Sequence, residues 1–340
     1  MENEPEELSP ADRSLLEQVA KCREYGDLQD LTEEKLCSIT DTRGIDFATA
    51  LLYDRVVSSA EHCGAIEELK KLRNVSTAEF LAPDVTLAVA PGAFYLEYPE
   101  TGADGAKILN AAETLGCQAE LIPTKSVGTV NENAETIVSW LLQHQGKRII
   151  LASLSKGGAD IKVALRHARA AEAFKDVAAW INVGGITNGS PIVTWIHTRT
   201  VPTLIAKLLF WWRGRTLQFL KDLDRRAKMP LDFVLRTPKH MKVINVVGFP
   251  LTHHLSTKHS QTWHRRLVEF GPNDAATVLI DSCKLPGVVF PIWGADHYSV
   301  DKVDWKNLTL SVLRYLEREL DPTDRPGMEN RVPVGANRTP

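Results

Sequence analysis

A strand that passes almost directly into a helix lies near the middle of the chain, and it constrains the fold more than any other stretch. Residues 149–152 form a short aliphatic run of the kind that is buried in a sheet. Residues 159–165 carry apolar side chains at helical spacing. Between them lies the bend Ser153-Leu154-Ser155-Lys156-Gly157-Gly158, which is rich in small residues. The stretch therefore predicts a cramped strand-to-helix turn at one edge of a sheet.

The bend has the spacing of a G-x-S-x-G motif, in which a sharp turn lifts a serine hydroxyl above the sheet. Ser153 stands at the first glycine position and Gly157 at the second, so Ser155 is the candidate nucleophile. Two other interpretations stay open: the small residues only allow close packing of the helix, or they hold a phosphate at its N-terminus. The phosphate-loop pattern G-x-x-x-x-G-K-[ST] is absent, because Lys156 precedes the glycines.

Strands and helices alternate on both sides of this bend. Further strands are expected at 85–90, 118–122, 180–185, 242–248 and 288–294, and helices at 106–115, 131–145 and 305–320. This alternation predicts an α/β fold with a mostly parallel central sheet and helices on both faces. Pro291 cannot donate a ladder hydrogen bond, so the last strand is expected at a sheet edge.

The pattern divides the chain into four parts. Residues 1–80 read as an N-terminal helical extension, and residues 81–320 as the α/β domain. The alternation is interrupted at about 190–240, which we interpret as an inserted helical cap. Residues 321–340 are rich in proline, glycine and charge, and they predict a disordered tail.

The predicted cap contains a strongly apolar run at 203–212, interrupted only by Lys207. Such a run is either a core helix or a lid that lies over an apolar site or against lipid. We adopt the lid as a working hypothesis, which makes Leu208, Trp211 and Trp212 candidate substrate-binding residues and allows a peripheral membrane contact through the cap.

Composition excludes several classes of protein. The chain is 44% hydrophobic and 24% charged, as in globular proteins, and its net charge of -3 gives no reason to expect a nucleic-acid partner. Its five cysteines are scattered without a C-x-x-C pair, which fits a reducing compartment. The acidic N-terminus lacks the apolar core of a secretory signal, and no run approaches the roughly 18 apolar residues of a membrane span. We therefore expect a cytoplasmic protein.

A serine nucleophile needs a base within hydrogen-bond reach and a third group to orient that base. In folds with this kind of bend the acid and then the histidine follow the serine along the chain. His297 lies just after the last predicted strand, at the sheet edge where Ser155 is expected. Asp274 is the candidate acid, with Asp281 and Asp296 as its rivals.

From about residue 84 to residue 320 the chain resembles the α/β-hydrolases, and within them the branch of lecithin:cholesterol acyltransferase and GPI-inositol deacylase. The segment 273–278 is similar to the G-D-G-T-V-P-like acid turn of that branch, and 183–191 is similar to its V-G-G-…-G-[ST]-P segment. The departures are Ser153 for the first glycine of the bend and Ala275 for the glycine after the acid. The N-terminal helical region lies outside the resemblance.

The resemblance implies an oxyanion hole formed by the amide after the nucleophile, at Lys156, and by an amide of the Gly92-Ala93-Phe94 turn, so Ala93 and Phe94 are candidate donors. It also implies a serine hydrolase without a cofactor, acting through a Ser155-Asp274-His297 triad and an acyl-enzyme on a small-molecule or lipid-like ester or thioester with an apolar acyl group. An acyltransferase and a non-catalytic binding protein on the same fold are the alternatives.

A cluster of histidines after the strand at 242–248 is the competing feature of the sequence. It comprises His253, His254, His259 and His264. Zinc sites on one element use tight spacings such as H-E-x-x-H, and these four histidines match none of them. The sequence therefore predicts no metal site.

Overall fold

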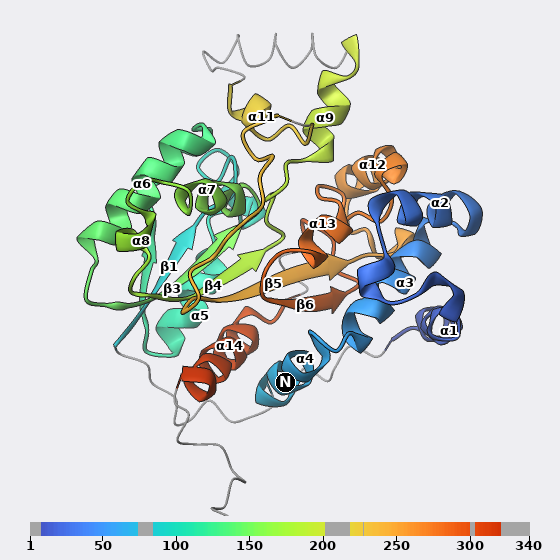
Figure 1. The fold of residues 1–340 in the computed structure, drawn as a ribbon, viewed down its shortest axis with the longest axis horizontal. Coiled ribbons are helices and arrows are strands. Elements are labelled where there is room, and N and C mark those ends of the chain that lie inside the picture. The colour runs from blue at the N-terminus through green and yellow to red at the C-terminus, as the bar shows by residue number, and fades with distance from the viewer. Residues whose placement is uncertain (1–7, 74–83, 201–217, 227, 300–302, 321–340) are drawn as a thin grey trace, which may run out of the picture.

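The computed structural model describes residues 8–73, 84–200, 218–226, 228–299 and 303–320. At its centre lies a six-stranded sheet in the order β2-β1-β3-β4-β5-β6, in which every neighbouring pair is parallel (Figure 1). The strands are β1 Val85–Ala90, β2 Gln118–Leu121, β3 Arg148–Leu154, β4 Val177–Val183, β5 Lys242–Phe249 and β6 Val288–Trp293. The predicted parallel sheet is confirmed, and β6 with its Pro291 lies at the edge, as expected.

Helices precede, connect and follow the strands. They are α1 Pro10–Ala20, α2 Glu33–Arg43, α3 Ile45–Ser58, α4 Cys63–Arg73, α5 Ala106–Thr114, α6 Val130–Gln143, α7 Lys156–Ala164, α8 Ala170–Ala173, α9 Pro191–His197, α11 Gln218–Asp222, α12 Lys258–Arg266, α13 Leu279–Cys283 and α14 Trp305–Leu320. The predicted closing helix has the bounds of α14. Sequence patterning missed α12, because its residues are mostly polar and basic and leave little apolar period to recognise.

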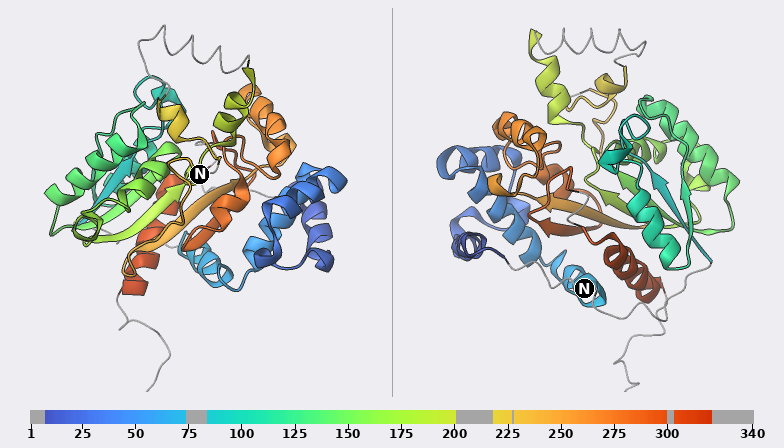
Figure 2. Two further views of the ribbon diagram at one scale, coloured as in Figure 1. Left: turned by 45° about the horizontal axis from the view of Figure 1, so that its top comes forward. Right: turned by 180° about the vertical axis from the view of Figure 1, so that it is seen from behind.

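The two faces of the sheet carry separate apolar cores. On one face α4, α5 and α14 pack on side chains such as Leu87, Ile150 and Ile244. On the other face α6, α7 and α8 pack on Leu151, Trp180 and their neighbours. Two further views show these two layers of helices with the sheet between them (Figure 2). This doubly covered sheet is why the strands are apolar on both sides.

The N-terminal helices wrap around the β6 edge of the sheet. Residues of the α2–α3 region share a core with Val247 and Phe249 at the end of β5 and with Val289 of β6. Leu69 and Leu72 of α4 instead join the core on the opposite face, where α4 lies beside α14. The segment thus covers both flanks of an edge strand, which limits the pairing that a bare edge would invite.

A row of buried polar side chains crosses the middle of the sheet on the face that α7 covers. Ser153, Asn182 and Asn245 occupy paired positions on β3, β4 and β5. Ser153 Oγ donates to Asn182 Oδ1 at 3.1 Å, Asn182 Nδ2 donates to Asn245 Oδ1 at 3.1 Å, and Asn245 Nδ2 donates to the Pro286 carbonyl at 3.1 Å. Trp180 Nε1 donates to Ser153 Oγ at 2.8 Å. The row satisfies polar groups that burial would otherwise leave without partners.

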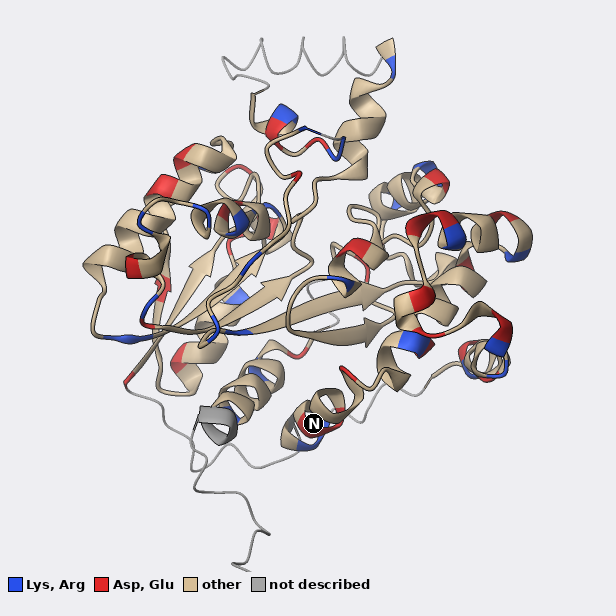
Figure 3. Ribbon diagram, viewed as in Figure 1, with Lys and Arg blue, Asp and Glu red and all other residues tan. Residues whose placement is uncertain are grey.

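Charged residues lie on helices and loops, while the strands are nearly free of them (Figure 3). Among the helices in the described ranges, none is long and apolar enough to cross a membrane.

Candidate active site

Ser155 occupies the bend between β3 and α7 in a strained backbone conformation. Its φ of 50° and ψ of -113° lie in a region that residues with a side chain rarely adopt. The bend is held from both sides, because the Ser155 amide donates to the Val183 carbonyl at 3.1 Å and the Ile186 amide donates to the Ser155 carbonyl at 2.9 Å. The half-buried Ser155 side chain is thus presented by a turn that its neighbours fix in place.

At Gly157 and Gly158 the surrounding atoms leave no space for a side chain. A Cβ on Gly157 would lie 2.3 Å from the Ala90 carbonyl oxygen, and a Cβ on Gly158 would lie 2.6 Å from Asn182 Oδ1. Both contacts are far below van der Waals distance, so α7 approaches the ends of β1 and β4 as closely as its backbone allows. The close-packing interpretation of these small residues is therefore correct for Gly157 and Gly158, and it coexists with the presented serine.

Ser153 replaces the first glycine of the motif without a conformational penalty. It lies within β3, at a position where the backbone is extended, and its side chain is fully buried. Its hydroxyl accepts from Trp180 Nε1 and donates to Asn182 Oδ1, so both of its hydrogen-bonding roles are used. The departure from glycine here adds polar contacts to the sheet and leaves the bend intact.

His297 is brought to Ser155 by the loop that follows β6. His297 Nε2 lies 2.9 Å from Ser155 Oγ, and His297 Nδ1 lies 2.9 Å from Asp274 Oδ2. The imidazole is nearly buried, with a side-chain exposure of 8%. Gly184 forms one wall beside the ring: a Cβ at that position, where φ is 52°, would lie 3.3 Å from His297 Nδ1. The structure thus brings together the three side chains that the sequence singled out.

Asp274 is held by its own turn. Its Oδ1 accepts the backbone N–H groups of Ala276, at 2.9 Å, and Thr277, at 2.6 Å, which leaves Oδ2 for His297. The His297 amide donates to the Asp274 carbonyl at 2.9 Å, so the acid turn and the histidine loop are joined through the backbone as well. Ala275, at the position where the acid turn it resembles has a glycine, has a φ of 78° and keeps the left-handed conformation that glycine would adopt freely.

The two rival acids are engaged elsewhere. Asp281 pairs with Arg225, with Oδ2 2.8 Å from Arg225 Nε. Asp296 accepts hydrogen bonds from Ser256, Tyr298 and Ser299, which fold the histidine loop around its carboxylate. Asp274 is the acid that contacts the imidazole, while Asp296 shapes the loop that carries it.

Two opposing effects act on the pKa of His297. Burial lowers the pKa of the imidazole, but the charge and hydrogen bond of Asp274, together with the charge of Asp296, outweigh burial and raise the pKa above its ordinary value of 6.5. The arrangement therefore favours the imidazolium form, which is the form that a base assumes after it has taken a proton.

Backbone amides next to Ser155 are the candidate oxyanion donors. The amide of Lys156 is the first of α7 and belongs to the group of N–H groups that a helix ladder leaves without an internal partner. On the opposite loop the Phe94 amide donates to the Ser126 carbonyl at 3.3 Å, which directs it into the protein. Of the two predicted donors on this loop, Phe94 therefore has its amide engaged by Ser126.

The side chain of Lys156 has a role that sequence reasoning did not foresee. Its ammonium lies 2.7 Å and 2.8 Å from the two oxygens of Asp160, one helical turn further along α7, and both side chains are 1% exposed. Asn133 Nδ2 of α6 donates to the same carboxylate at 2.8 Å. Burial raises the pKa of Asp160 to about 6, against the lowering effect of Lys156 and Asn133. The pair ties the start of α7 to α6.

The structure separates the four histidines of the segment after β5. Nε2 of His254 lies 3.0 Å from Asp12 Oδ2, and Nε2 of His253 lies 3.1 Å from Asp12 Oδ1, so these three side chains form a cluster that metal-ligand geometry permits. Against a metal, His254 Nδ1 accepts the Leu251 amide at 3.0 Å, which places the ring proton on Nε2, where a metal would need a lone pair. The cluster docks α1 onto the loop after β5.

The remaining two histidines lie apart from that cluster. His259 Nε2 lies 3.3 Å from the Tyr298 hydroxyl, next to His297, and His264 is buried on α12. Burial lowers the pKa of both imidazoles. They contribute to the packing around the histidine loop.

The predicted cap residues Leu208, Trp211 and Trp212 lie outside the described residues, as does the predicted tail at 321–340. Within the predicted cap at about 190–240 the structure describes α9, near its beginning, and α11, nearer its end. The Phe219 ring of α11 meets Phe94 edge to face, with centroids 5.6 Å apart. An apolar cluster that includes Ala159, Ile186 and Val193 lies beside these rings and next to the serine bend.

Comparison with known proteins identifies the fold. No protein-family model matches the sequence, and a search of curated proteins returns no match. Among solved structures the chain is similar to the metagenomic carboxyl esterase MGS0156, with a TM-score of 0.56 and 18% identity over 71% of this chain and 78% of that one. It is also similar to the mature Bacillus licheniformis lipase BlEst2, with a TM-score of 0.50 and 21% identity over 70% of this chain and 94% of that one.

These similarities, together with the parallel sheet and its flanking helices, define the class: the chain has the α/β-hydrolase fold. At this level of identity the comparison establishes the fold, and function has to be argued from the site.

Proposed function

We propose that this protein is a serine hydrolase in which Ser155 is the nucleophile, His297 the general base and Asp274 the orienting acid. The observation that carries the proposal is the continuous set of contacts from Ser155 Oγ through His297 to Asp274, each 2.9 Å long, at a strained strand-to-helix bend. A non-catalytic binding protein has no need of a serine and an imidazole within roughly 3.2 Å of each other, so this geometry favours catalysis.

The mechanism follows from these contacts. Ser155 Oγ attacks the carbonyl carbon of an ester or thioester while His297 Nε2 accepts its proton. Asp274 holds the Nδ1 proton and stabilises the imidazolium that forms. The amides of Lys156 and Ala93 stabilise the developing oxyanion. His297 then gives its proton to the leaving group. A water molecule that His297 activates in the same way hydrolyses the acyl-enzyme, which releases the acid and restores Ser155.

We propose that the substrate carries an apolar acyl group. The apolar side chains of Phe94, Ile186 and Phe219 beside the serine bend support this, as does the fold shared with a carboxyl esterase and a lipase. The cap, with any membrane contact it makes, and the cytoplasmic location stay predictions. So does membership of the lecithin:cholesterol acyltransferase and GPI-inositol deacylase branch, for which the conformation of Ala275 in the acid turn is the supporting observation.

An active-site fluorophosphonate tests the proposal directly. The probe should label the wild-type protein at Ser155, found by mass spectrometry of the modified peptide, and should leave folded Ser155→Ala unlabelled. A series of p-nitrophenyl esters of rising chain length then defines the acyl preference. Folded wild-type protein that neither reacts with the probe nor cleaves any of these esters would overturn the assignment.

Transfer of the acyl group to an alcohol in place of water is the close alternative. It uses the same three residues and differs only in the acceptor, so product analysis with and without added alcohols separates the two.

A further inference from the structure

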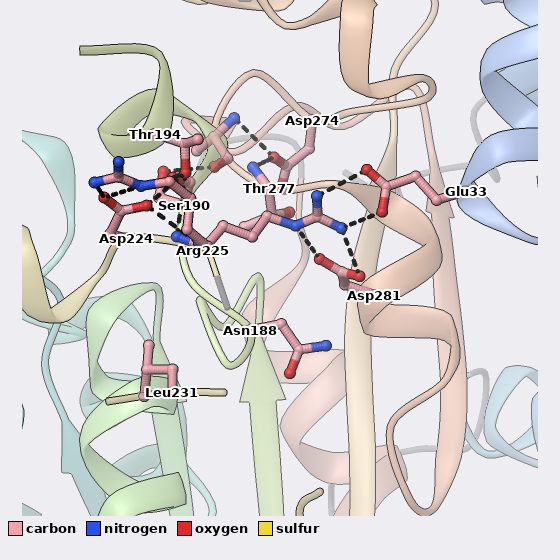
Figure 4. A network of polar contacts seen from close by, with 12 residues as sticks. Glu33, Asn188, Ser190, Thr194, Asp224, Arg225, Leu231, Asp274, Thr277 and Asp281 are labelled. Carbon is pink, nitrogen blue, oxygen red and sulfur yellow. Dashed lines mark hydrogen bonds and ion pairs between the residues drawn. The ribbon is translucent and has the colours of Figure 1, made fainter. Parts of the chain in front are cut away.

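Arg225 joins three segments that are far apart in the sequence (Figure 4). Its guanidinium binds Glu33 of α2 through two nitrogens, at 2.8 Å and 2.6 Å, and binds Asp281 of α13 through two nitrogens, at 2.8 Å and 3.0 Å. Arg225 itself lies within the predicted cap, on the segment that follows α11 and returns to the sheet. One side chain therefore ties the N-terminal helices, the return of the insertion and the helix after the acid turn to a single point.

Arg225, Glu33 and Asp281, here called the hub, are partly buried. The side chain of Arg225 is 15% exposed, that of Asp281 20% and that of Glu33 32%. Burial lowers the pKa of the guanidinium, but its hydrogen bonds to Glu33 and Asp281 and their charges raise it much further, so the arginine stays charged. Two planar, two-point contacts of this kind fix the orientation of both carboxylates, which a lysine could not do.

Two short paths connect this hub to the acid turn. On the first, Asp281 lies on α13, which begins directly after the turn at 273–278. On the second, the return segment pairs with Ser190: the Ser190 amide donates to the Leu223 carbonyl at 2.7 Å, and Ser190 Oγ donates to the Ala276 carbonyl at 3.0 Å.

The turn reached by these paths is the one that orients the acid. The Ala276 carbonyl that Ser190 holds belongs to the same peptide group as the Thr277 amide, which donates to Asp274 Oδ1 at 2.6 Å. A shift of this peptide therefore changes the direction in which Asp274 Oδ2 faces His297.

We propose that Arg225 is a positioning residue for Asp274, and that Glu33 makes the N-terminal helical segment part of that support. The inference rests on the proposed function for its catalytic meaning. The structural claim, that Arg225 sets the contact between Asp274 and His297, has a readout that does not require activity: the pKa of His297.

The test compares Arg225→Met with Arg226→Met. Arg226 is the matched control, because it is the neighbouring arginine on the same segment, is 52% exposed and pairs with Asp224 in place of Glu33 and Asp281. Histidine NMR titration of each protein measures the pKa of His297, with His297→Gln used to assign its signal. A stopped assay with the best p-nitrophenyl ester gives the pH profile of kcat/KM.

With Arg225→Met the acid turn is freed, Asp274 contacts His297 less well, and the pKa of His297 falls toward the value that burial alone would set. The acidic limb of the pH profile should move to lower pH, and kcat should fall between about tenfold and about 100-fold, the range for a slightly misplaced catalytic group. Arg226→Met should match wild type in both measurements. Glu33→Gln should shift the pKa in the same direction by less, and Arg225→Lys should restore part of the loss.

Each outcome decides between positioning and general stability. If Arg225→Met only lowers the fraction of folded protein, total activity falls, but the pKa of His297 and the acidic limb of the kcat/KM profile stay unchanged. That result would overturn the proposal. If Arg225→Met does not fold, Arg225→Lys and Glu33→Gln carry the same comparison. If wild type shows no hydrolase activity, the proposed function fails, while the NMR titration still confirms or refutes the link from Arg225 to His297.

Discussion

Two bends deliver the two ends of the Ser155–His297–Asp274 arrangement, and each departs from the α/β-hydrolase pattern at one glycine. In the serine bend the departure is Ser153, which lies in extended strand backbone and has both hydrogen-bonding roles satisfied. In the acid turn the departure is Ala275, which keeps a φ of 78°. The first glycine was replaceable because its conformation is ordinary, whereas the second position retains the glycine-like conformation at a cost in strain.

The comparison separates two reasons for glycine. Gly157 and Gly158 cannot carry a Cβ because backbone and side-chain oxygens occupy the space. At Ala275 the space for a methyl exists, since the residue is fully buried and accommodated, and only the backbone conformation disfavours it. Replacement of a motif glycine is therefore tolerated where the glycine is favoured only by its backbone conformation. It is not tolerated where a Cβ would have no space.

The largest effect on activity is expected from Ser155→Ala, which removes the nucleophile that both bends serve to position and activate. Ser155→Ala removes the nucleophile, and ester hydrolysis should fall by about 10^4-fold or more, as for loss of a triad nucleophile. Thermal unfolding should change little, because among the described residues the half-buried hydroxyl has a single hydrogen-bond contact, with His297. Steady-state assays and a melting curve check the two expectations together, and residual activity within tenfold of wild type would contradict them.

Asp274→Asn attacks the acid turn while the serine bend stays intact. The amide cannot hold the imidazolium, so activity should drop by about 10^4-fold. Because Asp274 raises the pKa of His297 and burial lowers it, the acidic limb of kcat/KM against pH should also move to lower pH. The sign follows from the base acting in its neutral form: a lower pKa leaves His297 neutral at lower pH. A limb that stays in place would show that Asp274 does not set the pKa.

Gly157→Ala tests the requirement for room in the serine bend. The new Cβ would meet the Ala90 carbonyl at 2.3 Å, and backbone on both sides has little freedom to move, so the free energy of unfolding should fall by about 3 kcal/mol and activity should be lost. Gly64→Ala is the control, since a Cβ there meets nothing within 4 Å. Chemical denaturation of both variants measures the difference, and equal stability of the two would show that the bend is not packed as described.

Ser153→Ala tests whether the hydroxyl of Ser153 stabilises the fold. Trp180 Nε1 loses its buried acceptor, which should cost about 1–3 kcal/mol of stability. Catalysis per folded molecule should stay near wild type, because the backbone of the strand is unchanged. A loss of activity that exceeds the loss of folded protein would indicate that Ser153 acts on the reaction itself.

The smallest effect is expected for Ala275→Gly, which introduces the glycine of the similar acid turn named in the sequence analysis. Relief of the left-handed strain, about 1–2 kcal/mol, is offset by the larger entropy of a glycine in the unfolded chain and by the lost burial of one methyl. We expect a change in stability within about 1 kcal/mol and activity within a few-fold. A stabilisation well above that value would show that Ala275 is more strained than its neighbours indicate.

Sequence reasoning succeeded where local pattern determines structure. The strands were located by their aliphatic runs, β6 was placed at the edge through Pro291, and the histidine followed from the direction in which parallel strands end. These features follow from a few neighbouring residues each, or from a general rule of parallel sheets.

Sequence reasoning missed one helix with a weak apolar pattern and several side-chain contacts. Helix α12 has too few apolar positions to show a period, and the acids Asp281 and Asp296 could be told from Asp274 only by their partners, Arg225 and Ser256. The buried Lys156–Asp160 pair was also missed. Its spacing of four residues on α7 was a signal that could have found it, since side chains so spaced share one helix face.

The polar row through β3, β4 and β5 has a consequence for how the chain reaches its fold. Strands that are apolar on both faces carry no inside-outside alternation to tell one alignment from the next, so sliding by a residue or two would change little in apolar burial. Here such a slide would leave the buried side chains of Asn182 and Asn245 without hydrogen-bond partners, at a cost of about 1–3 kcal/mol for each unmatched group. The row therefore favours the observed alignment of the three central strands over alignments shifted by a residue or two.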